Sequence, residues 1–111
     1  MDQLTIYRQH IKSLLSQYVA GAKPQDHFES QLILDEEHDH YLWLDVGWDG
    51  SKRIYHSIVH FDIKNGKIWL QENMTDLDPA EALVELGVRR EDIVLGLQPP
   101  YKRPYTDYGV A

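Results

Sequence analysis

Two runs rich in apolar residues, separated by Asn65-Gly66, constrain the fold more than any other feature of this sequence. Asn and Gly both tolerate the positive φ of a two-residue type I′ turn, so the runs are predicted to pair as a β-hairpin. Counting back from the turn places Phe61 opposite Leu70 and His60 opposite Gln71. The predicted apolar face comprises Val59, Phe61, Ile63, Ile68 and Leu70. The predicted mixed face comprises Ile58, His60, Asp62, Trp69 and Gln71.

A second hairpin is predicted at Asp49-Gly50, after strands expected at residues 28–35 and 41–48. The charged stretch at residues 36–39 reads as the turn between these strands. With side chains alternating along the second strand, we expect Leu42 and Leu44 to extend the apolar face. Tyr41 and Trp43 are then predicted on the mixed face.

Helices are predicted at the two ends of this strand region. Apolar residues spaced three or four apart predict an amphipathic helix over residues 3–20, capped by Asp2 and ended near Gly21. They are Leu4, Tyr7, Ile11, Leu14, Leu15 and Tyr18. Asp78-Pro79 signals the start of a short second helix, which Gly87 ends. Residues 93–95 are apolar and predicted to pack inward.

From Pro99 the chain is expected to form an irregular tail, because three prolines interrupt any regular ladder. The expected fold class is therefore α+β. It has a long N-terminal helix packed on a mainly antiparallel meander of about four strands, followed by a short second helix and the tail. We expect a single domain over residues 1–111.

Composition narrows the function classes. With 11 Lys and Arg against 18 Asp and Glu, the net charge is −7, which opposes a large footprint on nucleic-acid phosphates. The sequence has no cysteine, which excludes disulfides and thiol chemistry. It has neither a signal peptide nor an apolar run of about 18 residues, so we expect a cytoplasmic protein without a membrane partner.

Candidate catalytic or metal-binding residues are few. His56, His60 and Asp62 are the residues that a small hydrolase or metal-dependent enzyme would use. However, the two histidines are predicted on one strand, roughly 13 Å apart, where they cannot chelate one ion. The sequence also lacks P-loop, GxSxG, HExxH and dinucleotide-binding motifs. We therefore expect no enzymatic activity, no metal and no cofactor, and keep the small hydrolase as an alternative.

Aromatic surface on the predicted mixed face favours a protein interaction instead. The possible covers of this face are the C-terminal segment, a second copy of the chain and a different protein. We expect it, with tyrosines of the tail, to contact a second copy in a dimer or a different protein. The predicted interface comprises Tyr41, Trp43, Ile54, His56, Ile58, His60, Trp69, Tyr101 and Tyr105. Direct DNA binding is a further alternative, and would require basic residues to converge into one patch. They are Lys52, Arg53, Arg89, Arg90, Lys102 and Arg103.

Several segments together resemble the XisI family. They are RIYHSIVHFDIKNGKIWLQ at 53–71 with Thr75-Asp76, LVELGVRREDIVLG at 83–96, KRPYTDYGVA at 102–111, DHYLWLDVGWDG at 39–50 and the YRQHIKSLLSQY helix. The resemblance covers nearly the whole chain. Where many family members have Asp-Gly before the Thr-acid pair, this chain has Asn73-Met74.

The resemblance implies a cyanobacterial-type controlling factor for excision of the fdxN DNA element, a developmental DNA rearrangement that a separate recombinase carries out. It also implies a XisH-like partner, which resembles restriction-endonuclease folds. It supplies no catalytic residues. The expected function is thus that of a non-enzymatic accessory or regulatory protein that acts through protein–protein contact.

Overall fold

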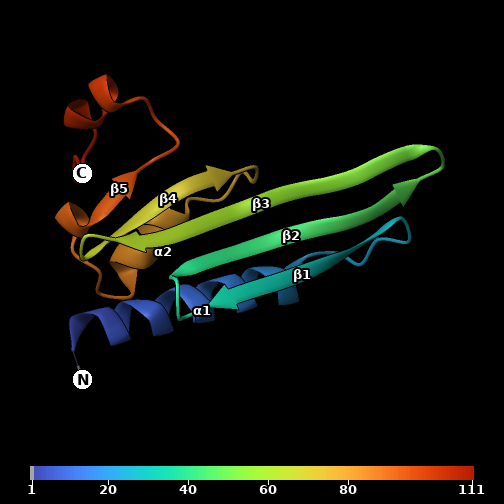
Figure 1. Cartoon of the computed structure of the whole chain (residues 1–111), viewed down its shortest axis with the longest axis horizontal. Helices are drawn as coiled ribbons and strands as arrows, with labels where there is room; N and C mark the ends of the chain where they lie inside the picture. The colour runs from blue at the N-terminus through green and yellow to red at the C-terminus, as the bar shows by residue number, and fades with distance from the viewer. Residues whose placement is uncertain (1) are drawn as a thin grey trace.

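A computed structural model describes residues 2–111. Its chain forms one open sheet with a long helix across one face (Figure 1). The helices are α1 (Gln3–Gly21) and α2 (Pro79–Glu85), with 3₁₀ turns η1 (Arg90–Asp92) and η2 (Pro100–Tyr105). The strands are β1 (Phe28–Asp35), β2 (His40–Asp49), β3 (Lys52–Lys64), β4 (Lys67–Asn73) and β5 (Ile93–Leu95). The predicted α+β class is confirmed.

The sheet has the order β1-β2-β3-β4-β5, and the first four strands form the predicted antiparallel meander. Asn65 and Gly66 have φ of 54° and 77°, so both positions adopt the positive φ that the turn requires. At the other hairpin Asp49 lies opposite Lys52, and Gly50 supplies the positive φ of 62°. The residues that tolerate positive φ therefore set the positions of both hairpin turns, and with them the ends of the strands that the turns connect.

The helices begin as predicted because their caps satisfy free backbone N–H groups. The Asp2 carboxylate accepts a hydrogen bond from the Thr5 N–H at 2.8 Å. Asp78 accepts one from the Glu81 N–H at 3.1 Å, with Pro79 in the first turn of α2.

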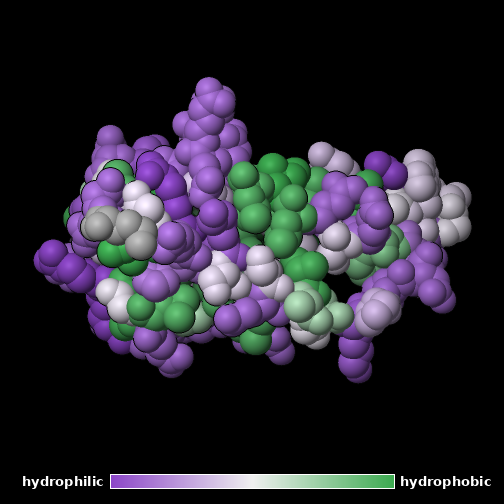
Figure 2. Space-filling model, turned by 90° about the horizontal axis from the view of Figure 1, so that it is seen from below, coloured by the Kyte–Doolittle hydropathy of each residue, from purple (hydrophilic) through white to green (hydrophobic). Residues whose placement is uncertain are grey.

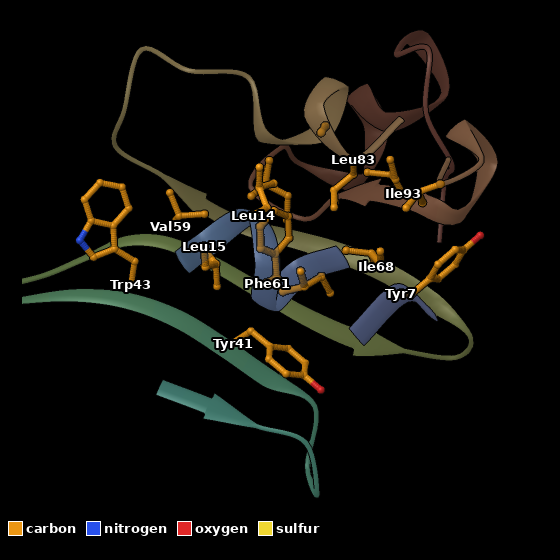
Figure 3. Close-up of a cluster of buried hydrophobic side chains, with 14 residues drawn as sticks. Tyr7, Leu14, Leu15, Tyr41, Trp43, Val59, Phe61, Ile68, Leu83 and Ile93 are labelled. Atoms are coloured by element: carbon orange, nitrogen blue, oxygen red, sulfur yellow. The ribbon is translucent and has the colours of Figure 1, made fainter. Parts of the chain in front are cut away.

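The inner face of the sheet, defined as the face that α1 covers, holds the core (Figure 3). From α1, all six residues of the predicted stripe contribute, and Ile11 and Leu15 are fully buried. They pack against Phe61, Ile68 and Leu70, residues of the predicted apolar face. Burial of these side chains holds the helix on the sheet.

A β-bulge between β2 and β3 overturns part of the predicted face assignment. Leu44 lies opposite Ser57, but Trp43 lies opposite Val59, which leaves Ile58 as the extra residue. Tyr41 and Trp43 consequently face inward and are 0% and 8% exposed. Their predicted position on the face opposite α1 is wrong, because one extra residue reverses the parity of everything beyond it. Ile58 also packs against the core rather than on the mixed face.

A second bulge lies between β3 and β4. The predicted pairs Phe61–Leu70 and Asp62–Trp69 are present, but His60 lies opposite Glu72 rather than Gln71. The expected His60–Gln71 pair is therefore wrong. Asp62 and Trp69 still lie on the outer face, defined as the face that α1 does not cover.

The C-terminal segment adds a strand that the sequence did not predict. Residues 93–95 pack inward as expected, but they do so as β5, which pairs parallel to β4. Gly109 then bridges Val94, so the last residues extend the sheet edge. Between them, η2 places the Arg103 guanidinium 5.2 Å from the centre of the Trp69 ring. The tail thus folds back onto its own sheet, because β5 directs it there.

Within residues 2–111, no helix is both long and apolar enough to span a membrane.

Candidate functional site

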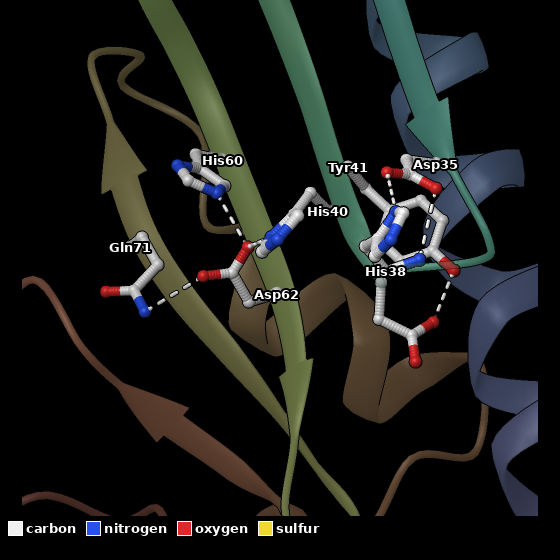
Figure 4. Close-up of polar contacts among 8 residues, drawn as sticks. Asp35, His38, His40, Tyr41, His60, Asp62 and Gln71 are labelled. Carbon is white, nitrogen blue, oxygen red and sulfur yellow. Dashed lines mark hydrogen bonds and ion pairs between the residues drawn. The ribbon is translucent and has the colours of Figure 1, made fainter.

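The outer face of the sheet carries two groups of side chains that the core does not use. One is a histidine–aspartate cluster of His40, His60 and Asp62, which lies where β2, β3 and β4 run side by side (Figure 4). The other is the hairpin surface, defined as Val46, Trp48, Arg53 and Tyr55 at the far end of β2 and β3. Strand alternation and register determine both groups.

The histidine–aspartate cluster is produced by the sheet register. His40 lies directly opposite Asp62 on the neighbouring strand, and His60 precedes Asp62 by two residues on the same strand. All three side chains therefore project from the same face. The Nδ1 atom of His40 and the Nε2 atom of His60 lie 2.8 and 2.7 Å from the same atom, Oδ1 of Asp62.

A third neighbour fixes the Asp62 carboxylate. The Gln71 side-chain amide donates a hydrogen bond of 3.2 Å to Oδ2 of Asp62. Gln71 is itself confined, because its Oε1 atom lies 2.5 Å from the position that a Cβ on Gly96 would occupy. The carboxylate is thus held from three directions by β2, β3 and β4.

These contacts set the protonation of the cluster. Burial opposes ionisation of Asp62, but the hydrogen bonds from His40 and His60 outweigh it, so the pKa of Asp62 lies below its usual value. The same hydrogen bond to Asp62 raises the pKa of His40. An ionised carboxylate only accepts hydrogen bonds, so each facing ring nitrogen carries a proton. The cluster therefore brings two imidazole nitrogens and a negatively charged carboxylate oxygen together, which is a donor set that a cation can bind.

The trio of His56, His60 and Asp62, proposed from sequence for a hydrolase, is not brought together. His56 lies opposite Asp45, which also contacts Trp43 on the inner face, whereas His60 is on the outer face. The bulge at Ile58 separates the two histidines onto opposite faces. Sequence reasoning considered His40 only with its neighbours His38 and Asp39 in the turn. It missed the pairing of His40 with Asp62, which depends on the register and on no local motif.

The hairpin surface lies where the sheet projects beyond α1 (Figure 1). Trp48 and Tyr55 are 56% and 60% exposed, which is unusual for aromatic side chains of their size. The Arg53 guanidinium lies 5.1 Å from the Trp48 ring centre and 5.8 Å from that of Tyr55. This stacking holds two exposed rings in a fixed arrangement.

Apolar surface is also present along the neighbouring edge. Ile33 and Leu34 of the edge strand β1 are 42% and 36% exposed. Figure 2 shows the largest area of hydrophobic surface near the middle of the molecule, with smaller hydrophobic areas toward one end. Within the described part of the chain, apolar side chains are thus exposed on the edge strand β1 as well as on the hairpin surface.

The predicted interface residues are divided between several environments. Tyr41 and Trp43 are buried under α1, and Trp69 is 7% exposed beneath the tail. His60 belongs to the outer-face cluster, whereas Ile54 and His56 lie opposite Gly47 and Asp45. Tyr101 and Tyr105 of η2 are 72% and 90% exposed. Sequence reasoning missed Trp48 and Tyr55, because alternation from Leu44 placed them on the predicted apolar face. The bulge puts Leu42, Leu44 and these two residues on the outer face instead.

The six basic residues do not converge into one patch. Lys52 and Arg53 lie at the tip of the β2–β3 hairpin, and the other four lie at the opposite end of the molecule (Figure 1). Arg89 pairs with Glu91, and Arg90 pairs with Glu81. Lys102 and Arg103 belong to η2, where Arg103 donates to backbone carbonyls. This arrangement does not offer the continuous positive stripe that a DNA duplex requires.

A family model and two crystal structures relate this chain to XisI proteins. The family model described as XisI protein matches residues 1–110. The crystal structure of a XisI-like protein from Anabaena variabilis ATCC 29413 is 59% identical, covers 98% of this chain and 100% of its own, and superposes with a TM-score of 0.94. That of the fdxN element excision controlling factor XisI from the same organism is 40% identical, covers 99% and 100%, and has a TM-score of 0.89. A search of curated proteins returned no match.

Proposed function

The chain belongs to the XisI family, and we propose that it is an accessory protein that controls excision of a DNA element by binding a partner protein. A 40% identical relative is named as the controlling factor for excision of the fdxN element. In this proposal the chain does not catalyse strand exchange. It regulates the protein that acts on the DNA.

The observation that supports this proposal most is the hairpin surface. Trp48 and Tyr55 each stack against Arg53 yet remain more than half exposed. Trp, Tyr and Arg are the residue types that most often dominate binding energy at protein interfaces. Because stacking on Arg53 favours this arrangement before binding, it reduces the conformational entropy that binding would cost.

We propose that the partner is a XisH-like protein with a nuclease fold. The net charge of −7 disfavours this chain as a reader of DNA phosphates and favours a partner with a basic surface. A nuclease-like protein requires such a surface to bind DNA. The net negative charge of the whole chain would then steer the two proteins together, and the aromatic rings of the hairpin surface would form the contact.

The proposal is tested by co-purification of this chain with a XisH-like protein, followed by titration calorimetry. Trp48→Ala and Tyr55→Ala are each expected to weaken binding by at least about tenfold, as is typical of interface anchors. Leu86→Ala is the matched control: this apolar residue is 41% exposed just after α2, away from the hairpin surface, and its loss should leave affinity unchanged.

Two outcomes would contradict the proposal. If wild-type protein does not bind the XisH-like partner and sediments as a dimer that Trp48→Ala dissociates, the surface serves self-association. If only Tyr105→Ala weakens partner binding, the contact lies on the tail rather than on the hairpin. Circular dichroism of each variant establishes that the fold is retained.

A further inference from the structure

The histidine–aspartate cluster differs from an ordinary surface ion pair in how its atoms converge. Two imidazole nitrogens from different strands point at the same carboxylate oxygen, at 2.8 and 2.7 Å. One donor atom from each of His40, His60 and Asp62 lies within 4.8 Å of the others. We propose that these three residues form a binding site for one divalent transition-metal ion, for which Zn²⁺ is the test ligand.

The donor set favours this class of ion. Two imidazole nitrogens and one carboxylate oxygen suit borderline metals such as zinc, iron, nickel and copper, whereas calcium and magnesium prefer oxygen ligands. Three protein ligands leave at least one coordination position for water or another group, as in open zinc sites. The side chain of His40 is 55% exposed, so that position is accessible from solvent.

The geometry requires little change on binding. With bonds of about 2.0 to 2.2 Å, an ion holds adjacent ligand atoms about 3.0 to 3.5 Å apart. The present N–O separations of 2.8 and 2.7 Å would each need to open by less than about 1 Å. The exposed His40 ring can supply part of this movement by rotation. Each ring nitrogen would bind the ion in its unprotonated form, so the proton that a neutral imidazole now directs at Asp62 would move to its other ring nitrogen.

The surroundings are also suitable. Asp62 is fixed by the Gln71 amide at 3.2 Å through the carboxylate oxygen that the histidines do not contact. Such outer contacts orient a ligand and increase metal affinity. The three ligands come from paired strands in the middle of the sheet, so their backbone positions are rigid before the ion arrives.

This inference revises the sequence-based expectation of no metal. That expectation rested on the spacing of His56 and His60 along one strand and on the poor spacing of His38 and His40 within one turn. The fold instead brings His40 beside Asp62 across 22 residues of sequence. The inference does not depend on the proposed partner, because the cluster and the hairpin surface are separate groups.

The test is isothermal titration of ZnCl₂ into untagged, metal-free protein at pH 7.5. We expect one ion per chain in the wild type. His60→Asn and Asp62→Asn should each weaken binding at least tenfold, since loss of even an outer contact costs about tenfold to hundredfold. His56→Asn is the matched control on the same strand, and its affinity should equal that of the wild type.

X-ray absorption of Zn²⁺-loaded wild type tests the ligands without a variant. We expect two imidazoles and at least one oxygen around zinc. The proposal would be overturned by an absence of binding at millimolar Zn²⁺ or by a zinc shell with fewer than two imidazoles. Equal weakening in His56→Asn and His60→Asn would also overturn it, since this would indicate scattered binding to surface histidines.

Discussion

Arg8 of α1 donates two hydrogen bonds to Asp39, of 2.8 Å from Nε and 3.1 Å from Nη2, and thereby joins the helix to the β1–β2 turn. Asp39 also accepts a 2.7 Å hydrogen bond from the hydroxyl of the fully buried Tyr41. Its φ of 60° places it in the left-handed region, which Asp and Asn tolerate better than most residues. One turn residue thus connects the helix, the turn and the core.

Replacing Asp39 with Asn should lower the free energy of unfolding by about 1 to 2 kcal/mol near neutral pH, because hydrogen bonds to charged groups are the stronger ones. Asn keeps the backbone preference and an acceptor for Tyr41 but removes the charge that Arg8 binds. Urea unfolding measures the difference.

This effect should depend on pH. The hydrogen bonds from Arg8, which outweigh the opposing effect of burial, lower the pKa of Asp39. A carboxyl whose pKa is lower when folded stabilises the protein above its unfolded pKa of about 3.8, and that contribution is lost as pH falls through the folded value. The stability gap between wild type and Asp39→Asn should therefore be constant above about pH 5 and close below about pH 4.

Glu36→Gln provides the control for Asp39→Asn. Glu36 pairs with Lys12 between the same two elements, but its side chain is 53% exposed. We expect a change of less than about 0.5 kcal/mol, as for other exposed pairs. An equal loss in both variants would contradict the special role of Asp39.

Trp43→Ala and Trp48→Ala should have very different effects on stability, although both residues lie on β2. Trp43 is 8% exposed, and its ring centre is 6.5 Å from that of Tyr18 on α1. Its loss should cost about 3 to 5 kcal/mol through the cavity it leaves. Trp48 is 56% exposed, so its loss should cost less than about 1 kcal/mol. Thermal unfolding of both variants checks the face assignment, and the reverse order would refute the bulge at Ile58.

Gly47→Ala should destabilise the pairing of β1 with β2. A Cβ at Gly47 would lie 2.1 Å from the His27 carbonyl oxygen and 2.5 Å from Phe28 Cα, both backbone atoms that cannot rotate away. We expect a loss of about 1 to 3 kcal/mol in urea unfolding. Gly21→Ala is the control, since a Cβ there meets nothing within 4 Å and should be neutral or stabilising. Near-wild-type stability of Gly47→Ala would show that β1 is free to move.

Arg103→Ala should loosen the tail without unfolding the sheet. The Arg103 guanidinium stacks on Trp69 and donates a 3.1 Å hydrogen bond to the Gln98 carbonyl. Hydrogen exchange of the Gly109 amide, which bonds to the Ile93 carbonyl at 2.7 Å, should accelerate about fivefold, equivalent to about 1 kcal/mol of lost stacking. The exposed Lys102→Ala should leave that rate unchanged. An unchanged rate in Arg103→Ala would mean that other contacts hold the tail.

Most of the secondary structure could be predicted because it depends on local chemistry. Asn65-Gly66 favours one turn type, Asp2 and Asp78 satisfy the first N–H groups of their helices, and spacing alone defines the buried stripe of α1. The register next to the Asn65-Gly66 turn followed from the turn itself. The family also follows from the sequence, because its motifs span nearly the whole chain.

Tertiary structure decided which side chains share a surface. No local signal marks Ile58 as an extra residue, because a bulge is selected by how two strands and a helix pack together rather than by the bulged residue alone. That single extra residue turns Trp43 into the core and places His56 and His60 on opposite faces. The residue that joins His60 and Asp62 on the outer face is therefore His40. β5 depends likewise on a partner strand distant in sequence, since three apolar residues become a strand only where β4 offers an unpaired edge. The sequence by itself determined both helices, the first four strands and the family, whereas long-range packing decided β5 and the candidate site.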